Sequence, residues 1–355
     1  MADGREGNQD RTIKKLLLVT NSLLLCIGSS AGPLVMRLYF IRGGHRVWLT
    51  SFLENAGFPV MFFPLAVSYI RRRRLSSAET EKPTIISMKP PVLVASVMIG
   101  ILSGLDDYFY AYSLARLPVS TNALVVSTQL GFTAFFALVL VRQRFTVYSV
   151  NAVILLSIAA GILALHTSGD RPRGESTKEY VMGFVMTILA AALHGVILPL
   201  IELLYKKTKQ PLTYSLVMEI QLVTTFFATL FCAVGMIVNN DFKVIPREAR
   251  DFKHGEGNYY VVLVGSAILW QAFFMGAIGV IFCASSLLSG ILIAVMLPVT
   301  EVLAVVFFKE KFQPEKGVSL LLSIWGFVSY FYGEIKQTTK LNSTTTEETE
   351  LSRST

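Results

Sequence analysis

Residues 285–308 read SSLLSGILIAVMLPVTEVLAVVFF, a continuous apolar stretch in which Glu301 is the one ionisable side chain. A helix that spans a bilayer needs about 20 mainly apolar residues, so this stretch predicts a transmembrane helix. Nine further segments have the same length and character; they lie at 16–36, 47–70, 92–115, 119–141, 147–166, 180–204, 212–237, 258–281 and 314–334. The sequence therefore predicts an all-α polytopic membrane protein with ten transmembrane helices.

The composition agrees with this class. Of the 355 residues, 53% are hydrophobic and only 16% are charged, whereas about 25% are charged in soluble domains. The net charge of +8 does not indicate a nucleic-acid partner, because Lys and Arg lie in loops that flank the apolar segments. We expect the lipid bilayer to be the surrounding partner and exclude nucleic acid.

The order of the segments predicts an internal repeat. Five spans lie in residues 16–166 and five in residues 180–336, separated by a polar connecting loop at 167–179. An odd number of spans reverses the orientation of the second half. The basic turn at 142–145 (RQRF) also aligns with the turn at 309–312 (KEKF), which indicates two inverted five-helix repeats, an organisation typical of transporters.

An even number of spans places both termini on one side of the membrane. The distribution of Lys and Arg favours the cytoplasm for that side by a small margin, which depends on the cluster at 71–74. We therefore expect a cytoplasmic N-terminal tail at 1–15. The residues at 337–355 are rich in Thr, Ser and Glu, so they predict a disordered cytoplasmic tail, in which the sequon at Asn342 stays unmodified.

Ionisable residues inside apolar spans are candidates for function, because a charge at mid-bilayer costs about 2.5–3.5 kcal/mol even on the lenient insertion scale. The adjacent Asp106 and Asp107 cannot both be charged cheaply. We interpret Asp106, Glu54 and Glu301 as proton-coupling candidates and Asp107 as a substrate-binding residue. The alternative for the acid pair is that its span ends earlier and leaves both residues in a solvated loop.

The repeat alignment also proposes substrate contacts. It matches the third span near Asp106 with Trp270 and Gln271 of the eighth span, so these two side chains should face the acid pair across a central cavity. An indole can stack on a flat heteroaromatic ring, and an amide can pair with an adenine edge. The alternatives are a membrane-interface tryptophan and an interhelical hydrogen bond.

Other polar residues are less decisive. Asn122 and Gln129 are seven residues apart and share a helix face, where they can line the same cavity or join helices by hydrogen bonds. His194 can relay protons, but a packed helix histidine is the preferred interpretation. The sequence contains no nucleotide-binding glycine loop, metal-ligand cluster or nucleophile motif, so we expect neither an enzyme nor a resident cofactor or metal.

Four segments of the chain are similar to the plant purine permeases, a branch of the drug/metabolite transporter superfamily: GPLVMRLYF at 32–40, LPVST at 117–121, GAIGVIFCASS at 276–286 and WGFVSYFYGE at 325–334. The resemblance covers about residues 16–336. It implies a ten-helix carrier that takes up adenine, related purines, cytokinins or some alkaloids and vitamins, with protons, at the plasma membrane. The chain departs from the usual family pattern at Asp106-Asp107, where Asp-Asn is usual, and at Arg42-Gly43-Gly44, where Asn-Gly-Gly is usual.

Together, these observations predict a proton-coupled uptake carrier for purine-type bases. The alternatives are a permease for an alkaloid or another nitrogen heterocycle, an uncoupled uniporter, and a signalling membrane protein that senses its ligand.

Overall fold

A computed structural model describes residues 2–75, 88–116, 126, 128–143, 145–165, 177–253, 255–308, 314, 317–333 and 335–336. Within these residues the regular secondary structure is entirely helical, which confirms the all-α class. The helices are α1 (Ala2–Ile41), α2 (Val47–Asn55), the 3₁₀ helix η1 (Phe58–Met61), α3 (Phe62–Leu75), α4 (Pro90–Arg116), α6 (Gln129–Val141), α7 (Val147–Leu165), α8 (Thr177–Lys207), α9 (Tyr214–Val238), α10 (Asp241–Asp251), α11 (Glu256–Cys283) and α12 (Ser286–Phe308). A C-terminal helix follows at Gly317–Gly333.

Seven segments of the described chain are helical, long and apolar enough to cross a membrane: Thr12–Ile41, Val47–Ile70, Pro90–Arg116, Val181–Lys207, Tyr214–Val238, Glu256–Cys283 and Ser286–Phe308. Three shorter apolar helices lie at Gln129–Val141, Val147–Ala159 and Gly317–Gly333. Large apolar side chains such as Phe63, Leu321 and Trp325 are exposed on the outer surface, where a bilayer would solvate them. The chain is thus a polytopic α-helical membrane protein.

The structure differs from the expected spans in two places. The segment 47–70 is not one continuous helix, because α2 ends at Asn55 and η1 and α3 follow after a break at Ala56-Gly57. Pro59 has no amide hydrogen to donate to the carbonyl of Asn55, so the α-helical pattern cannot continue there. The second difference is α10, a short amphipathic helix after α9 that is not among the predicted segments, because it is not apolar along its whole length.

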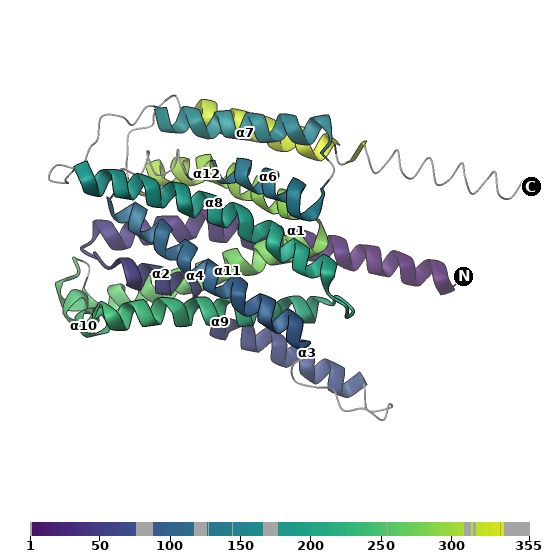
Figure 1. Ribbon diagram of the computed structural model, residues 1–355, viewed down its shortest axis with the longest axis horizontal. Coiled ribbons are helices and arrows are strands. Elements are labelled where there is room, and N and C mark those ends of the chain that lie inside the picture. The colour runs from purple at the N-terminus through teal and green to yellow at the C-terminus, as the bar shows by residue number, and fades with distance from the viewer. Residues whose placement is uncertain are drawn as a thin grey trace, which may run out of the picture.

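Helices from the two halves of the chain lie next to each other in one bundle (Figure 1). The most extensive helix contact joins α1 to α11, and glycines permit it: a Cβ at Gly28 would collide with the backbone of Phe273, and one at Gly276 with the backbone of Leu25. Helix α4 lies against both α8 and α9. At one edge of the bundle, α7 pairs with the C-terminal helix, and Ser319 donates a hydrogen bond to the carbonyl of Ala159.

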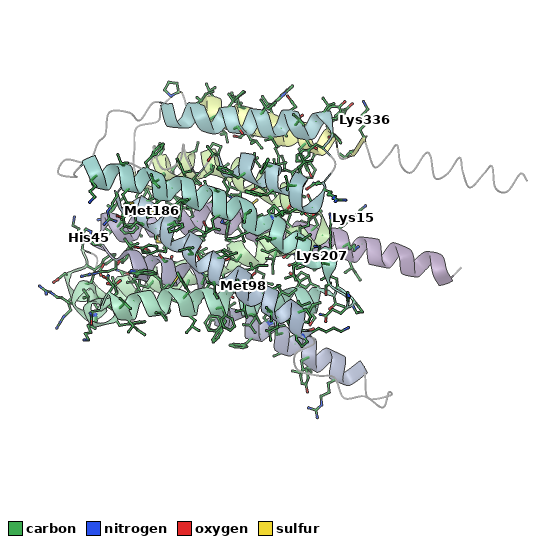
Figure 2. The ribbon with its side chains drawn as sticks, in the orientation of Figure 1. Lys15, His45, Met98, Met186, Lys207 and Lys336 are labelled. Atoms are coloured by element: carbon green, nitrogen blue, oxygen red, sulfur yellow. The ribbon has the colours of Figure 1, made fainter. Side chains whose placement is uncertain are left out.

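The helices run roughly along one axis, so the bundle has two ends. Figure 2 shows Lys15, Lys207 and Lys336 at one end and His45 at the other; we call these the Lys207 end and the His45 end. Helix α8 begins at Thr177, so residues 177–179 of the expected connecting loop are helical. The rest of that loop, Asn122 and the tail at 337–355 with Asn342 lie outside the described residues.

Candidate functional site

A cavity of about 90 Å³ lies inside the bundle. By this measure one water molecule needs about 10–15 Å³, so the cavity has room for several waters or a small ligand. Its walls come from helices of both halves of the chain. The lining residues are Ser29, Pro33, Glu54, Asp106, Asp107, Tyr110, Val126, Gln129, Ala190, Ala191, His194, Trp270, Phe273, Phe274, Ile293 and Leu297.

The acid pair lies within α4 and lines this cavity. Asp106 is 5% exposed and Asp107 is 4% exposed. Because α4 continues to Arg116, the alternative of a solvated loop is wrong. Consecutive residues of a helix point about 100° apart, so the two carboxyl groups face different neighbours. This geometry gives each one a separate set of contacts.

Asp106 points to α8. Its Oδ2 atom lies 2.8 Å from Nδ1 of His194, within hydrogen-bonding and ion-pairing distance. The preferred interpretation of His194 as a packed helix histidine missed this contact, because the two residues are 88 positions apart and the repeat alignment does not relate them. The Oδ1 atom of Asp106 and the Nε2 atom of His194 are buried and have no hydrogen-bond partner within the described ranges.

Asp107 points to α2. Its Oδ2 atom accepts a hydrogen bond from Nδ2 of Asn55, and its carboxyl group also forms a hydrogen bond with that of Glu54. A hydrogen bond between two carboxyl groups requires a proton on one of them. Glu54 is 2% exposed. The acid cluster therefore provides a buried position for a proton beside the cavity.

The break after α2 positions this cluster. Gly57 fits against the carbonyl of Ala267 and the side chain of Gln271 on α11, where a Cβ atom would collide. This close approach places the last turn of α2, with Glu54 and Asn55, in the interior of the bundle. Interrupted membrane helices commonly form the binding sites of carriers. The Gly57-Phe58-Pro59 sequence was the signal for this feature.

Trp270 lines the cavity and is 6% exposed, so it is not a membrane-interface residue. Its indole lies beside Gly32 of α1, where a Cβ would be 3.2 Å from Cε2. Tyr110 and Phe273 meet the ring edge-to-face, with centroids 6.3 and 5.4 Å away. The Nε1 atom has no hydrogen-bond partner in the described part of the chain. The ring is held by its neighbours and keeps one donor available.

The two glutamines occupy different places. Gln129 lines the cavity, as its helix-face position predicts, and is 9% exposed. Gln271 is not among the cavity-lining residues; it is 2% exposed and lies against Gly57. The expected placement of Gln271 facing the acid pair is therefore not observed. Adjacent helix residues point in different directions, so Trp270 and Gln271 do not share one cavity.

The remaining predicted site residues are Asn122 and Glu301. Asn122 lies outside the described residues, and for Glu301 only the helical backbone is described, in α12 three residues after Pro298.

A proline in α1 adds a backbone group that the sequence search missed. Pro33 lies within the helix and has no amide hydrogen, so it leaves the carbonyl of Ser29 without its usual helical donor. Both residues line the cavity. The Gly32-Pro33 dipeptide thus provides a close approach for Trp270 and removes one helical hydrogen bond from the cavity wall.

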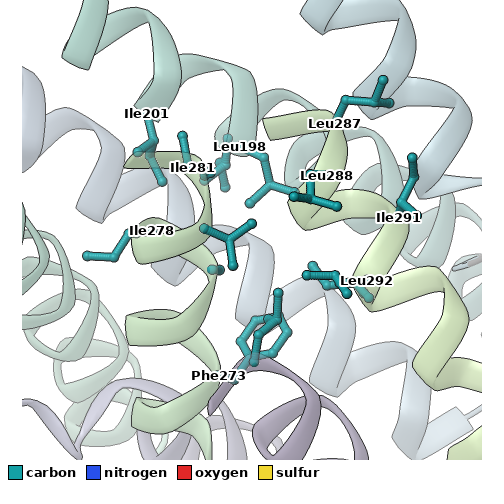
Figure 3. Close-up of a cluster of buried hydrophobic side chains, with 14 of the residues drawn as sticks. Leu198, Ile201, Phe273, Ile278, Ile281, Leu287, Leu288, Ile291 and Leu292 are labelled. Atoms are coloured by element: carbon teal, nitrogen blue, oxygen red, sulfur yellow. The ribbon is translucent and has the colours of Figure 1, made fainter. Parts of the chain in front are cut away.

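Apolar side chains fill the space between the cavity and the Lys207 end. Figure 3 shows this cluster, in which Leu198 and Ile201 of α8 meet Ile278 and Ile281 of α11 and side chains of α12. On α8 these residues follow His194 toward Lys207. All four are at most 6% exposed. The cavity is therefore sealed on this path by close-packed apolar residues.

At the His45 end, polar contacts tie the α1–α2 turn to α10. Tyr39 donates a hydrogen bond to Oε1 of Glu248 over 2.6 Å, and Arg46 forms a 3.5 Å ion pair with Asp241. Burial raises the pKa of Asp241, while the hydrogen bond from Asn239 and the charge of Arg46 lower it, and the net direction is upward. These contacts join the first half of the chain to the second at the His45 end.

The fold and this site define a multi-pass membrane protein with an internal cavity lined by acidic and aromatic side chains. A family model described as "Purine nucleobase transmembrane transport" matches residues 16–340. The chain belongs to this family, the purine permeases.

Two curated relatives from Arabidopsis thaliana are similar over almost their full length. Purine permease 3 is 54% identical over 322 residues, which are 91% of this chain and 92% of the relative. Purine permease 2 is 51% identical over 352 residues, or 96% of this chain and 97% of the relative. A solved structure described only as "Crystal structure of protein" matches with a TM-score of 0.59 and 16% identity, covering 91% of this chain and 98% of that chain. This last likeness shows a shared fold alone.

Proposed function

We propose that this protein takes up purine-type bases, such as adenine and cytokinins, across the plasma membrane by symport with protons. Family membership supports the substrate class. The observation that supports proton coupling is the buried acid cluster, in which Asp106 contacts His194 and Asp107 shares a hydrogen bond with Glu54 at the wall of one cavity.

The proposed architecture has ten transmembrane spans in two inverted five-helix repeats, 16–166 and 180–336. Seven long apolar helices and three shorter ones coincide with the expected spans, which supports this count. Contacts between the two halves are consistent with the proposed pair of repeats, because α1 packs on α11 and α4 packs on α8 and α9. Both termini are proposed to face the cytoplasm, so the Lys207 end would be cytoplasmic.

The proposed proton path begins in the acid cluster. Asp106 takes up a proton when the cavity faces the acidic outside, which weakens its pairing with His194, and releases it when the site faces the neutral cytoplasm. Glu54 is the second proton carrier, since its hydrogen bond with Asp107 needs a proton. Glu301 remains a third candidate on the strength of its place in α12 near Pro298.

The proposed substrate site lies in the same cavity. A flat base stacks on Trp270, whose other surroundings are already filled by Gly32, Tyr110 and Phe273. The amide of Gln129 pairs with an edge of the base, a role that its position in the lining favours over Gln271. Asp107 accepts an N–H from the ring or its amino group. Asn122 is proposed as a further contact from its spacing to Gln129.

Accumulation separates this proposal from an uncoupled uniporter. With one proton for each substrate, a pH difference of two units supplies about 2.7 kcal/mol and a potential of 100 mV about 2.3 kcal/mol. Their sum allows a concentration ratio above about a thousandfold for a neutral base. We expect cells that express the protein to concentrate labelled adenine at external pH 5 and to lose the gradient when a protonophore is added. Uptake that stops at equal concentrations would contradict coupling, and failure of adenine to compete with other heterocycles would favour the alkaloid alternative.

A further inference from the structure

A second, smaller cavity lies on the other side of the Asp106–His194 pair. It measures about 20 Å³, and Asp106, His194, Phe273 and Phe274 line both cavities. The additional polar residues of its lining are Asn55, Ser103, Gln221, Thr224 and Thr225. The pair therefore stands between a larger cavity that can hold a substrate and a small one whose wall combines apolar side chains with several polar ones.

The two cavities lie in different directions from the pair. On α8 the larger cavity is lined by Ala190 and Ala191, which precede His194. The smaller cavity is lined by Ile197, Leu198 and Ile201, which follow His194 toward Lys207. The smaller cavity thus lies on the Lys207 side, next to the apolar seal.

Three buried polar atoms of the residues around the smaller cavity lack a partner within the described ranges. They are Oδ1 of Asn55, Oδ1 of Asp106 and Nε2 of Gln221, whose residues are 1%, 5% and 2% exposed. The orientation of the Asn55 amide follows from its other atom, because Nδ2 donates to the Asp107 carboxyl group. The set comprises two acceptors, when Asp106 is ionised, and one donor. Leaving such groups unsatisfied would cost about 1–3 kcal/mol each.

We propose that the smaller cavity binds one water molecule, which donates hydrogen bonds to Asn55 and Asp106 and accepts one from Gln221. A volume of about 20 Å³ suits a single water, and buried waters typically make about three hydrogen bonds. The hydroxyls of Thr224 and Thr225 donate to the carbonyls of Ser96 and Gln221, which leaves their oxygens able to accept. A water molecule has the two donors and the acceptor that the three atoms require.

This water gives the proton a route separate from the substrate, an inference that rests on the proposed function. The Asp106 carboxyl passes its proton to the water. When the apolar residues between the site and the Lys207 end separate and the site faces the cytoplasm, the water releases another of its protons to solvent, leaving a carboxylate and a neutral water. Within the described part of the chain, the titratable groups that interact electrostatically with this pair include Asp107 and Tyr110 on α4 and Glu54 on α2. Helices α9 and α11 line the small cavity with Gln221, Thr224 and Phe273, which carry no charge.

The experiment replaces the donor and keeps the substrate cavity intact. Gln221→Leu and Gln221→Met remove the donor to the water with side chains of similar size. We expect each to lower concentrative adenine uptake at external pH 5 at least tenfold, while exchange of preloaded labelled adenine and the KM for adenine stay within about twofold of the wild type. The control is Trp325→Ala on the outer surface, where Trp325 is 67% exposed; it should leave concentrative uptake, exchange and the KM for adenine at wild-type values.

A high-resolution structure of the wild-type protein that resolves ordered water decides the site itself. We expect density between Asn55, Asp106 and Gln221, and its loss in Gln221→Leu. A dry cavity would overturn the inference, and so would normal concentrative uptake by both Gln221 variants. If the wild type does not concentrate adenine at all, the proposed function fails instead, while the density still tests the water site.

Discussion

The Nδ1 atom of His194 lies 2.8 Å from the Oδ2 atom of Asp106, which joins α8 to α4 in the wall of the cavity. One residue comes from each half of the chain, so a change in protonation at this contact acts on the junction between the halves. Buried ion pairs depend on both partners, and removing one leaves an uncompensated charge. A proton taken up by Asp106 would therefore alter the force that holds α4 and α8 together. We interpret this contact as the point where proton binding and helix movement are coupled.

Asp107→Asn should preserve transport. An Asn side chain can accept the hydrogen bond from Asn55 through its oxygen and donate one to Glu54 through its amide, so both contacts of Asp107 are retained. We expect concentrative adenine uptake within about threefold of the wild type, with a changed preference among purines in a competition panel. Loss of both uptake and exchange in a variant with normal surface expression would show that the carboxylate itself is essential.

Trp270→Ala should weaken binding of every flat base. Loss of stacking costs on the order of 1–3 kcal/mol for each base, which corresponds to roughly a 5- to 150-fold higher KM. The pH dependence of uptake should stay that of the wild type, because Trp270 carries no titratable group. The control is Trp325→Ala, since Trp325 is 67% exposed on the outer surface. An equal rise in KM for both variants would contradict the proposal that the base stacks on Trp270.

Gly32→Ala tests the support beneath the indole. The added Cβ would lie 3.2 Å from Cε2 of Trp270, closer than ordinary van der Waals contact, so the ring must move. We expect up to about a tenfold rise in the KM for adenine, or ~1.4 kcal/mol, with little loss of protein in the membrane. Gly131→Ala is the matched control, because a Cβ on that helical glycine meets no atom within 4 Å in the described structure. Binding unchanged in Gly32→Ala would mean that Trp270 does not contact the base.

Asp241→Asn should change how stability depends on pH. The pKa of Asp241 is raised by burial, so its stabilising contribution is present below the unfolded value of about 3.9 and is lost as the pH rises through the folded value. An Asn side chain does not ionise and avoids this loss, while it can still accept from Asn239. The ion pair with the partly exposed Arg46 contributes little, about 0–1 kcal/mol.

Thermal unfolding of both proteins in detergent, from pH 4 to pH 7, measures this effect. The Tm of Asp241→Asn minus that of the wild type should increase as the pH rises. A difference that decreases over this range would show that the net effect on the pKa of Asp241 has the opposite sign.

The sequence predicted the class and the positions of the helices because long apolar segments leave few alternatives in a bilayer. It also identified Asp106, Asp107, Glu54 and Gln129 as candidates, and all four line the cavity. Each was detectable as a polar side chain in an apolar segment. Trp270 was reached through the repeat alignment alone, and Gln271, matched by the same alignment, lies against Gly57 and does not line the cavity.

Contacts between helices could not be predicted from the pattern of apolar and polar residues. The contact between His194 and Asp106 depends on how α8 packs against α4, and neither residue carries a local signal for the other. The break at Gly57 and the helix α10 were missed for a different reason. A search for apolar length averages over short interruptions and ignores amphipathic segments outside the membrane.

Proton movement during transport tests the central claim most directly. Purified protein is reconstituted in liposomes that contain a pH-sensitive dye, the membrane potential is held constant, and adenine is added outside. The account predicts acidification of the interior by the wild type and by Glu202→Gln, a control in which the side chain can still accept from the amide of Ser286. Asp106→Asn should exchange labelled adenine with no change in internal pH, because a permanently neutral side chain cannot release a proton. Import of adenine by the wild type without acidification, or acidification by Asp106→Asn equal to that of the wild type, would contradict the account.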